Sequence, residues 1–175
     1  MATAAEARTL QNFVGGAFVD ALADARLEDR DPANGELAAH VPLSGRSDVD
    51  SAVTAARGAQ PDWRAVPPQQ RARALLALRD ALVAHRDELT ALVTADMGKT
   101  LADADGEVGR GIESVESAAA IPHLLKGETL EGVASGLDVE MVRQPVGVVA
   151  AITPFNFPAM IPLWFLPYAV ACGNA

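Results

Sequence analysis

The stretch GVVAAITPFNFPAMIPLW at residues 147–164 decides the fold class. Its first six residues, GVVAAI, form a short and wholly apolar run, which is typical of a strand buried on both faces of a parallel sheet. A turn at residues 153–158 follows, and Pro158 stands where the first turn of a helix favours a proline. A buried strand, a turn and a helix in this order predict an α/β fold.

The turn is also the first candidate for a functional site. In open α/β sheets, ligands bind beyond the carboxyl ends of the strands, and the turn lies at such an end. Asn156 can donate its side-chain amide to a developing oxyanion, a contact worth about 3–4 kcal/mol in a transition state. The alternative is that Asn156 only caps the following helix, and the spacing alone favours this cap.

The segments upstream predict hairpins followed by helices. After a frayed tail of eleven residues, FVGGAFV predicts a hairpin at residues 13–19, and residues 27–42 predict a second one that turns at residues 32–35. Ser47 or Asp48 can cap a helix that runs toward Gln60.

A long helical region comes next and ends in an extended segment. Pro67 and Pro68 open it, a break falls near His85, Gly98 ends its second helix and Thr100 caps the next. The buried face of that last helix is expected at Val108, Ile112, Val115 and Ala119, with Pro122 as its end. Residues 127–144 read as extended, because apolar and polar residues alternate at positions 137–141 and predict a half-exposed strand.

Composition and charge exclude several classes of function. The 175 residues are 50% hydrophobic with a formal net charge of −9, and phosphate binding needs a basic face, so no nucleic-acid partner is expected. Residues 145–175 are uncharged, but five prolines interrupt them, so we expect a buried core and no membrane span. The only cysteine, Cys172, excludes an intramolecular disulfide and, with a start that lacks a secretory leader, favours a cytoplasmic location. The three histidines show no metal-ligand spacing, so no metal site is expected.

Two strings carry a resemblance to a known family. QPVGVVAAITPFNFPAMIPLW at residues 144–164 resembles the aldehyde dehydrogenase superfamily, whose hallmark is a Pro-aromatic-Asn-aromatic-Pro turn. GKTLADADGEVGRGIESVE at residues 98–116, and the sequence from IPHLLKGETLEG at residue 121 onward, look more narrowly like the CoA-acylating methylmalonate-semialdehyde dehydrogenase branch. The resemblance runs from about Phe13 to Ala175.

This resemblance implies roles for individual residues. Asn156 takes the place of the amide that stabilises the oxyanion, while Thr153 and Phe155 line the NAD site, with Ile152 beside the adenosine-ribose path. Arg110 takes the place of an arginine that meets the substrate carboxylate, for which a guanidinium is well shaped.

Each assignment has a structural alternative. Arg110 can instead pair on the helix surface with Glu107 and Glu113, and Thr153 and Phe155 can be simple core residues. Cys172 is expected to be structural, because its apolar neighbours offer nothing that would lower its pKa.

The resemblance also implies the architecture and its division. We expect the amino-terminal part of the aldehyde dehydrogenase fold, with an incomplete Rossmann-like NAD-binding domain and an extended oligomerisation hairpin. Residues 1–127 would be the hairpins and helices of the NAD-binding domain, 128–145 the oligomerisation strands, and 146–175 the first strand and helix of the dinucleotide-binding core. The complete enzyme is expected to be a homo-oligomer, namely a tetramer.

The implied reaction is the oxidation of malonate or methylmalonate semialdehyde to acetyl-CoA or propanoyl-CoA, with NAD as cofactor and CoA as co-substrate. Because the family's nucleophilic cysteine is absent, the chain is expected to be inactive alone. One alternative is a CoA-independent dehydrogenase, for example for succinate semialdehyde. The other is a non-catalytic module that binds a nucleotide or associates with another subunit.

Overall fold

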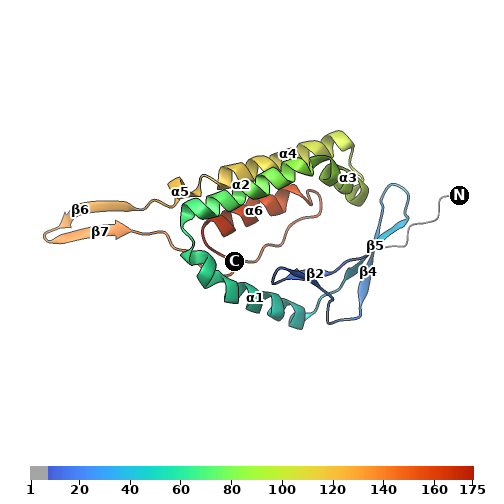
Figure 1. Ribbon diagram of the computed structural model, residues 1–175, viewed down its shortest axis with the longest axis horizontal. Coiled ribbons are helices and arrows are strands. Elements are labelled where there is room, and N and C mark those ends of the chain that lie inside the picture. Colours follow the sequence, from blue (N-terminus) through green and yellow to red (C-terminus); the bar gives the residue numbers. More distant parts are fainter. Residues whose placement is uncertain (1–7) are drawn as a thin grey trace.

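The computed structural model describes residues 8–175 and has the expected α/β composition, with small sheets beside a group of packed helices (Figure 1). The strands are β1 (Arg8–Thr9), β2 (Asn12–Val14), β3 (Ala17–Val19), β4 (Arg26–Arg30), β5 (Leu37–Pro42), β6 (Glu128–Ala134) and β7 (Leu137–Met141). The helices are α1 (Arg46–Ala65), α2 (Pro68–Ala84), α3 (Arg86–Met97), α4 (Leu101–Ala118), α5 (Ile121–Leu124) and α6 (Met160–Ala171). Within residues 8–175, no helix is both long and apolar enough to cross a membrane.

Both amino-terminal hairpins are confirmed. Strands β2 and β3 pair antiparallel around Gly15 and Gly16, whose φ angles of 62° and 84° are of the kind that favours glycine. Strands β4 and β5 also pair antiparallel. The expectation of a frayed tail through residue 11 is wrong from Arg8 onward, because β1 lies parallel to β5 and β2 begins at Asn12. The rest of that expected tail, residues 1–7, lies outside the described residues.

Helix α1 begins at Arg46, before either predicted cap. Gly45 is the capping residue, and the carboxylate of Asp48, three residues into the helix, accepts the Gly45 backbone N–H at 2.8 Å. The helix also continues past Gln60 to Ala65. Asp48 therefore stabilises the helix start from inside the first turn, in the return contact of a capping box.

The boundaries of the next helices largely agree with the sequence. Pro68 begins α2, His85 separates α2 from α3, and Gly98 ends α3 in a left-handed conformation at φ 78°. The Thr100 side chain caps α4 by accepting the N–H of Asp103 at 3.1 Å. Pro122 is not the end of α4, because that helix stops at Ala118 and Pro122 lies in the short α5.

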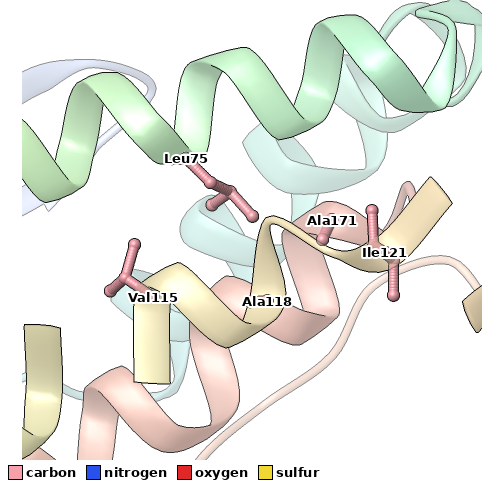
Figure 2. Packing of buried hydrophobic residues seen from close by; sticks show 5 residues of the cluster. All are labelled: Leu75, Val115, Ala118, Ile121 and Ala171. Atoms are coloured by element: carbon pink, nitrogen blue, oxygen red, sulfur yellow. The ribbon is translucent and has the colours of Figure 1, made fainter. Parts of the chain in front are cut away.

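Helix α4 lies at the centre of the core. Figure 2 shows Leu75 of α2 directed toward the helix that carries Val115 and Ala118 of α4, with Ala171 of α6 and Ile121 of α5 nearby. A second buried cluster joins α3 to α4 and consists of Val93, Ala104, Val108 and Ile112. Three of the four predicted face residues of α4 are buried, while Ala119 is only partly covered.

The extended segment upstream of residue 145 forms an isolated hairpin. Strands β6 and β7 pair antiparallel, and the hairpin projects away from the helices (Figure 1). Every residue of both strands is exposed, so the prediction of a half-exposed strand is wrong in detail. The reason is that, within the described residues, no other element covers either face of this hairpin.

The expected buried strand at residues 147–152 is not formed. The side chain of Ile152 is fully exposed, and the backbone of this segment is extended without a regular ladder. The Val149 N–H donates to the Ala175 carbonyl at 2.7 Å, and the Ala175 N–H donates to the Gly147 carbonyl at 2.9 Å. These two bonds flank Val148 as in one rung of a parallel pair, but Ala175 is the only neighbour that the segment has for such pairing here.

Candidate active site

The turn that contains Asn156 lies before α6 and does not supply its cap. Helix α6 begins at Met160, four residues after Asn156, so the predictions of a cap at Asn156 and of Pro158 in the first helical turn are wrong. The cap comes from α4, because the Glu107 carboxylate oxygen Oε1 accepts the N–H of Ala159 at 2.8 Å and of Met160 at 3.1 Å. The exposed Asn156 side chain is therefore left out of the helix cap.

Lys99 completes this arrangement. Its ammonium Nζ lies 2.5 Å from the Glu107 oxygen Oε2 and donates to the backbone carbonyl of Asn156 at 3.0 Å. It also lies 4.3 Å from the centre of the Phe157 ring, within the range of a cation–π contact. Burial alone would raise the pKa of Glu107, but the bonds from Lys99, Met160 and Ala159 outweigh it and leave this pKa below its usual value. Glu107 is thus held as a buried carboxylate.

Arg110 and Asn156 line the same hollow. This cavity of about 650 Å³ lies between α4 and the Asn156 turn, and its polar lining consists of Lys99, Asp103, Glu107, Arg110 and Asn156. Arg110 is exposed. The Glu107 carboxylate, with which Arg110 could have formed a surface pair, is bound by Lys99. The hollow is therefore lined by two exposed polar residues, Arg110 from α4 and Asn156 from the turn.

The residues expected at the cofactor lie outside this hollow. Ile152 lines a second cavity of about 400 Å³, which is formed by residues 149–152 and one face of α6. Phe155 is 93% exposed and Thr153 is half-buried. The alternative that Phe155 is a core residue is wrong for the described chain. The cavity that Ile152 lines is not lined by Thr153 or Phe155.

Cys172 lies at the opposite end of α6 from the Asn156 turn. Burial raises the pKa of its thiol, and the nearby Arg71 guanidinium offsets only part of this effect. The thiolate is the reactive form of cysteine, so a raised pKa makes Cys172 a poor nucleophile. Within residues 8–175, no three His, Cys, Asp or Glu side chains gather as a metal site would need.

Sequence reasoning missed Lys99 and the true role of Glu107. The sequence indicates Glu107 only as a possible surface partner of Arg110. The helical periodicity contains one signal of this role. Position 107 falls on the buried face of α4, together with Ala104, Val108 and Ile112. A carboxylate on such a face needs a cation and N–H donors, and the sequence alone does not say which segment supplies them.

Comparisons with known proteins settle the family. The model of the aldehyde dehydrogenase family matches residues 18–175. The chain belongs to this family. It is 50% identical over 169 residues to malonate-semialdehyde dehydrogenase 2 of Geobacillus thermodenitrificans (strain NG80-2), a match that covers 97% of this chain and 35% of the relative.

Solved structures agree with this assignment. The methylmalonate-semialdehyde dehydrogenase of Oceanimonas doudoroffii is 42% identical with a TM-score of 0.92, over 96% of this chain and 34% of that one. A Sinorhizobium meliloti 1021 protein, provisionally named as the same enzyme and solved with NAD, is 41% identical with a TM-score of 0.94, over 98% and 35% of the two chains. The chain thus spans about a third of the relatives' length, and the expected amino-terminal part of the aldehyde dehydrogenase fold is confirmed.

Proposed function

We propose that this chain is the amino-terminal part of an NAD-dependent, CoA-acylating dehydrogenase of malonate or methylmalonate semialdehyde. The observation that carries the proposal is the shared hollow of Arg110 and Asn156. The names of the similar proteins from Geobacillus and Oceanimonas support the same substrate class. The overall reaction balances, since malonate semialdehyde, NAD⁺ and CoA give acetyl-CoA, carbon dioxide and NADH.

Substrates of this class carry a carboxylate at one end and an aldehyde at the other. In the proposal, Arg110 binds the carboxylate, because its planar fork can bond both oxygens at once. Asn156 donates its amide to the oxygen of the aldehyde carbon when that oxygen becomes negative during addition of a nucleophile. The carboxylates of Asp103 and Glu107 also line the hollow, but Glu107 is neutralised by Lys99.

The chain would supply only part of the NAD site. Ile152 and Phe155 are exposed apolar side chains at the end of the segment 147–152, and such surfaces fit the flat faces of a dinucleotide's rings. Thr153 lies between them and offers a hydroxyl. NAD, when bound, accepts the hydride, while these three residues would hold and orient it.

The nucleophile of the proposed reaction would come from elsewhere in the complete enzyme. Helix α6 has 12 residues, so it is about 18 Å long and separates Cys172 from the Asn156 turn. Cys172 also carries a raised pKa. We therefore propose that residues 1–175 alone do not oxidise an aldehyde.

The complete enzyme is further proposed to be a cytoplasmic homo-oligomer. The hairpin β6–β7 exposes five apolar side chains, namely Leu130, Val133, Leu137, Val139 and Met141. A projecting two-stranded ribbon with uncovered apolar residues is suited to association with a second copy. The same feature supports the alternative of an association module without catalysis, for which the full-length protein would show no turnover of either aldehyde in the experiment below.

The experiment compares an aldehyde that carries a carboxylate with one that does not, both as substrates of the full-length enzyme. Arg110→Gln should lower kcat/KM for malonate semialdehyde by about 10- to 100-fold, the value of one charged hydrogen-bonded contact. For propanal, which has no carboxylate, the loss should stay below about threefold because no such contact exists. Arg73→Gln, which replaces an exposed arginine of α2, is the control. Equal losses with both aldehydes would refute the carboxylate role of Arg110.

A further inference from the structure

We infer that Lys99 and Glu107 are positioning residues, which hold the backbone of the Asn156 turn against α4 and so fix the oxyanion donor relative to Arg110. This inference rests on the proposed function of Asn156 and Arg110. It assigns to a buried ion pair a role in the reaction, although neither of its side chains would touch the substrate.

The pair binds the chain at two points, one within the turn and one just after it. Within the turn, the Lys99 ammonium donates to the Asn156 carbonyl at 3.0 Å. After the turn, the Glu107 carboxylate accepts the N–H groups of Ala159 and Met160. Because Lys99 and Glu107 also bond each other at 2.5 Å, the two points are joined through a single pair of side chains.

Burial makes this attachment stiff. The Glu107 side chain has no exposed surface and that of Lys99 has only 11% exposed. Screening by water is weak at such a site, so each bond to a charged group is stronger than its surface equivalent. The ring of Phe157, with its centre 4.3 Å from the ammonium, covers a further part of Lys99.

The same helix carries the other half of the site. Glu107 and Arg110 are three residues apart on α4, so they share one face of that helix. Next to them, Ala104, Val108 and Ile112 are buried and fix α4 in the core. Helix α4 therefore carries Arg110 and also holds the turn that contains Asn156. The spacing between the two residues is thereby fixed, which suits a substrate of one length.

Lys99 is poorly placed to bind the substrate carboxylate itself. Its ammonium already faces the Glu107 carboxylate, the Asn156 carbonyl and the Phe157 ring. Both residues line the hollow, but Arg110 is exposed, whereas the Lys99 side chain is only 11% exposed. Lys99 would accordingly act through Asn156, and its removal should matter only while the Asn156 amide is present.

This dependence can be measured in a double-mutant cycle on the full-length enzyme with malonate semialdehyde. Lys99→Met should lower kcat by about 10- to 100-fold, because a misplacement of about 1 Å has an effect of that size. KM should change by less than about threefold, since the affected contact belongs to the transition state. In an Asn156→Ala background, the same substitution should lower kcat by less than about threefold, because coupled residues are not additive.

Two further variants make the result independent of folding. Lys99→Met leaves the buried Glu107 charge unpaired, whereas Lys99→Met combined with Glu107→Gln removes both charges and keeps an amide oxygen for the α6 cap. The combined variant should show the same loss of kcat. Lys126→Met replaces the only other lysine, which is exposed and remote from the hollow, and serves as the control.

The outcomes separate the two proposals. Equal factors for Lys99→Met in both backgrounds, or a loss below threefold in the presence of Asn156, would overturn the positioning role. If Asn156→Ala itself left kcat unchanged, the oxyanion role of Asn156 would fail, and the inference that rests on it would fail with it.

Discussion

At the scale of single residues, Glu107 has a role in the structure that its position in the sequence does not reveal. The sequence places it three residues before Arg110 and allows a surface pair between them. The structure gives Glu107 a buried place, where it accepts two backbone N–H groups and one ammonium. Its negative charge is therefore needed for the stability of the α4–α6 junction.

This need predicts a dependence of stability on pH. The folded protein lowers the pKa of Glu107 below its usual value of 4.5, so its contribution is fully present above about pH 4.5. The contribution is lost as the pH falls through the lower, folded value, because protonation then removes the bond to Lys99. The wild type should be more stable than Glu107→Gln at pH 7, and the difference should shrink toward pH 3.

Urea unfolding at several pH values measures this difference. Asp50→Asn is a suitable control, because the Asp50 carboxylate is exposed and makes only a surface pair with Arg46 at 3.5 Å. A gap between wild type and Glu107→Gln that stays constant from pH 7 to pH 3 would contradict the assigned charge state.

At the scale of elements, the stability of the hairpin β6–β7 is the feature that contacts within this chain explain least. A two-stranded ribbon with both faces exposed is marginally stable by itself in water. Its cross-strand neighbours Leu130 and Val139 are 63% and 47% exposed, and they form an apolar patch on a projecting element. These properties are those of a surface that is covered in an assembly.

Charge placed on this patch should dissociate the assembly. Leu130→Glu combined with Val139→Glu puts two like charges opposite each other and should shift the full-length protein to smaller species in analytical ultracentrifugation. Leu22→Glu, at a comparably exposed leucine outside the hairpin, should leave the sedimentation unchanged. An unaltered oligomer in the hairpin variant would contradict the role of β6–β7 in association.

At the scale of the whole molecule, the sequence predicts features that depend on neighbouring residues better than features that depend on residues far apart in the chain. Proline and glycine positions indicate the limits of α2 and α3, because the backbone itself enforces them: Pro68 opens α2, and Gly98 ends α3. The segment 147–152 is predicted as a buried strand, but a strand needs backbone partners, and within residues 8–175 only Ala175 exchanges backbone hydrogen bonds with it. The sequence offers Asp48 as a cap of α1 but not its bond to Gly45, and it does not indicate that Glu107, 52 residues away, binds the first N–H groups of α6.

In the candidate site, too, the sequence indicates the residues that belong to a motif but not those that act through distant contacts. Motif resemblance was enough to choose Arg110 and Asn156, and the fold brings both to one hollow. It gave no indication of Lys99, whose contacts lie 8 and 57 residues away in the sequence. The chain covers about a third of its relatives' length, and the proposal places the nucleophile of the reaction outside these 175 residues.

The most direct test of the central claim is the product formed from malonate semialdehyde and NAD, with and without CoA, by the full-length protein and by residues 1–175 alone. We predict that the full-length protein forms acetyl-CoA in equal amount to NADH when CoA is present, and that residues 1–175 form no NADH. Formation of a free acid at an unchanged rate without CoA would instead indicate a CoA-independent dehydrogenase. Turnover by residues 1–175 alone would contradict the account of where the nucleophile lies.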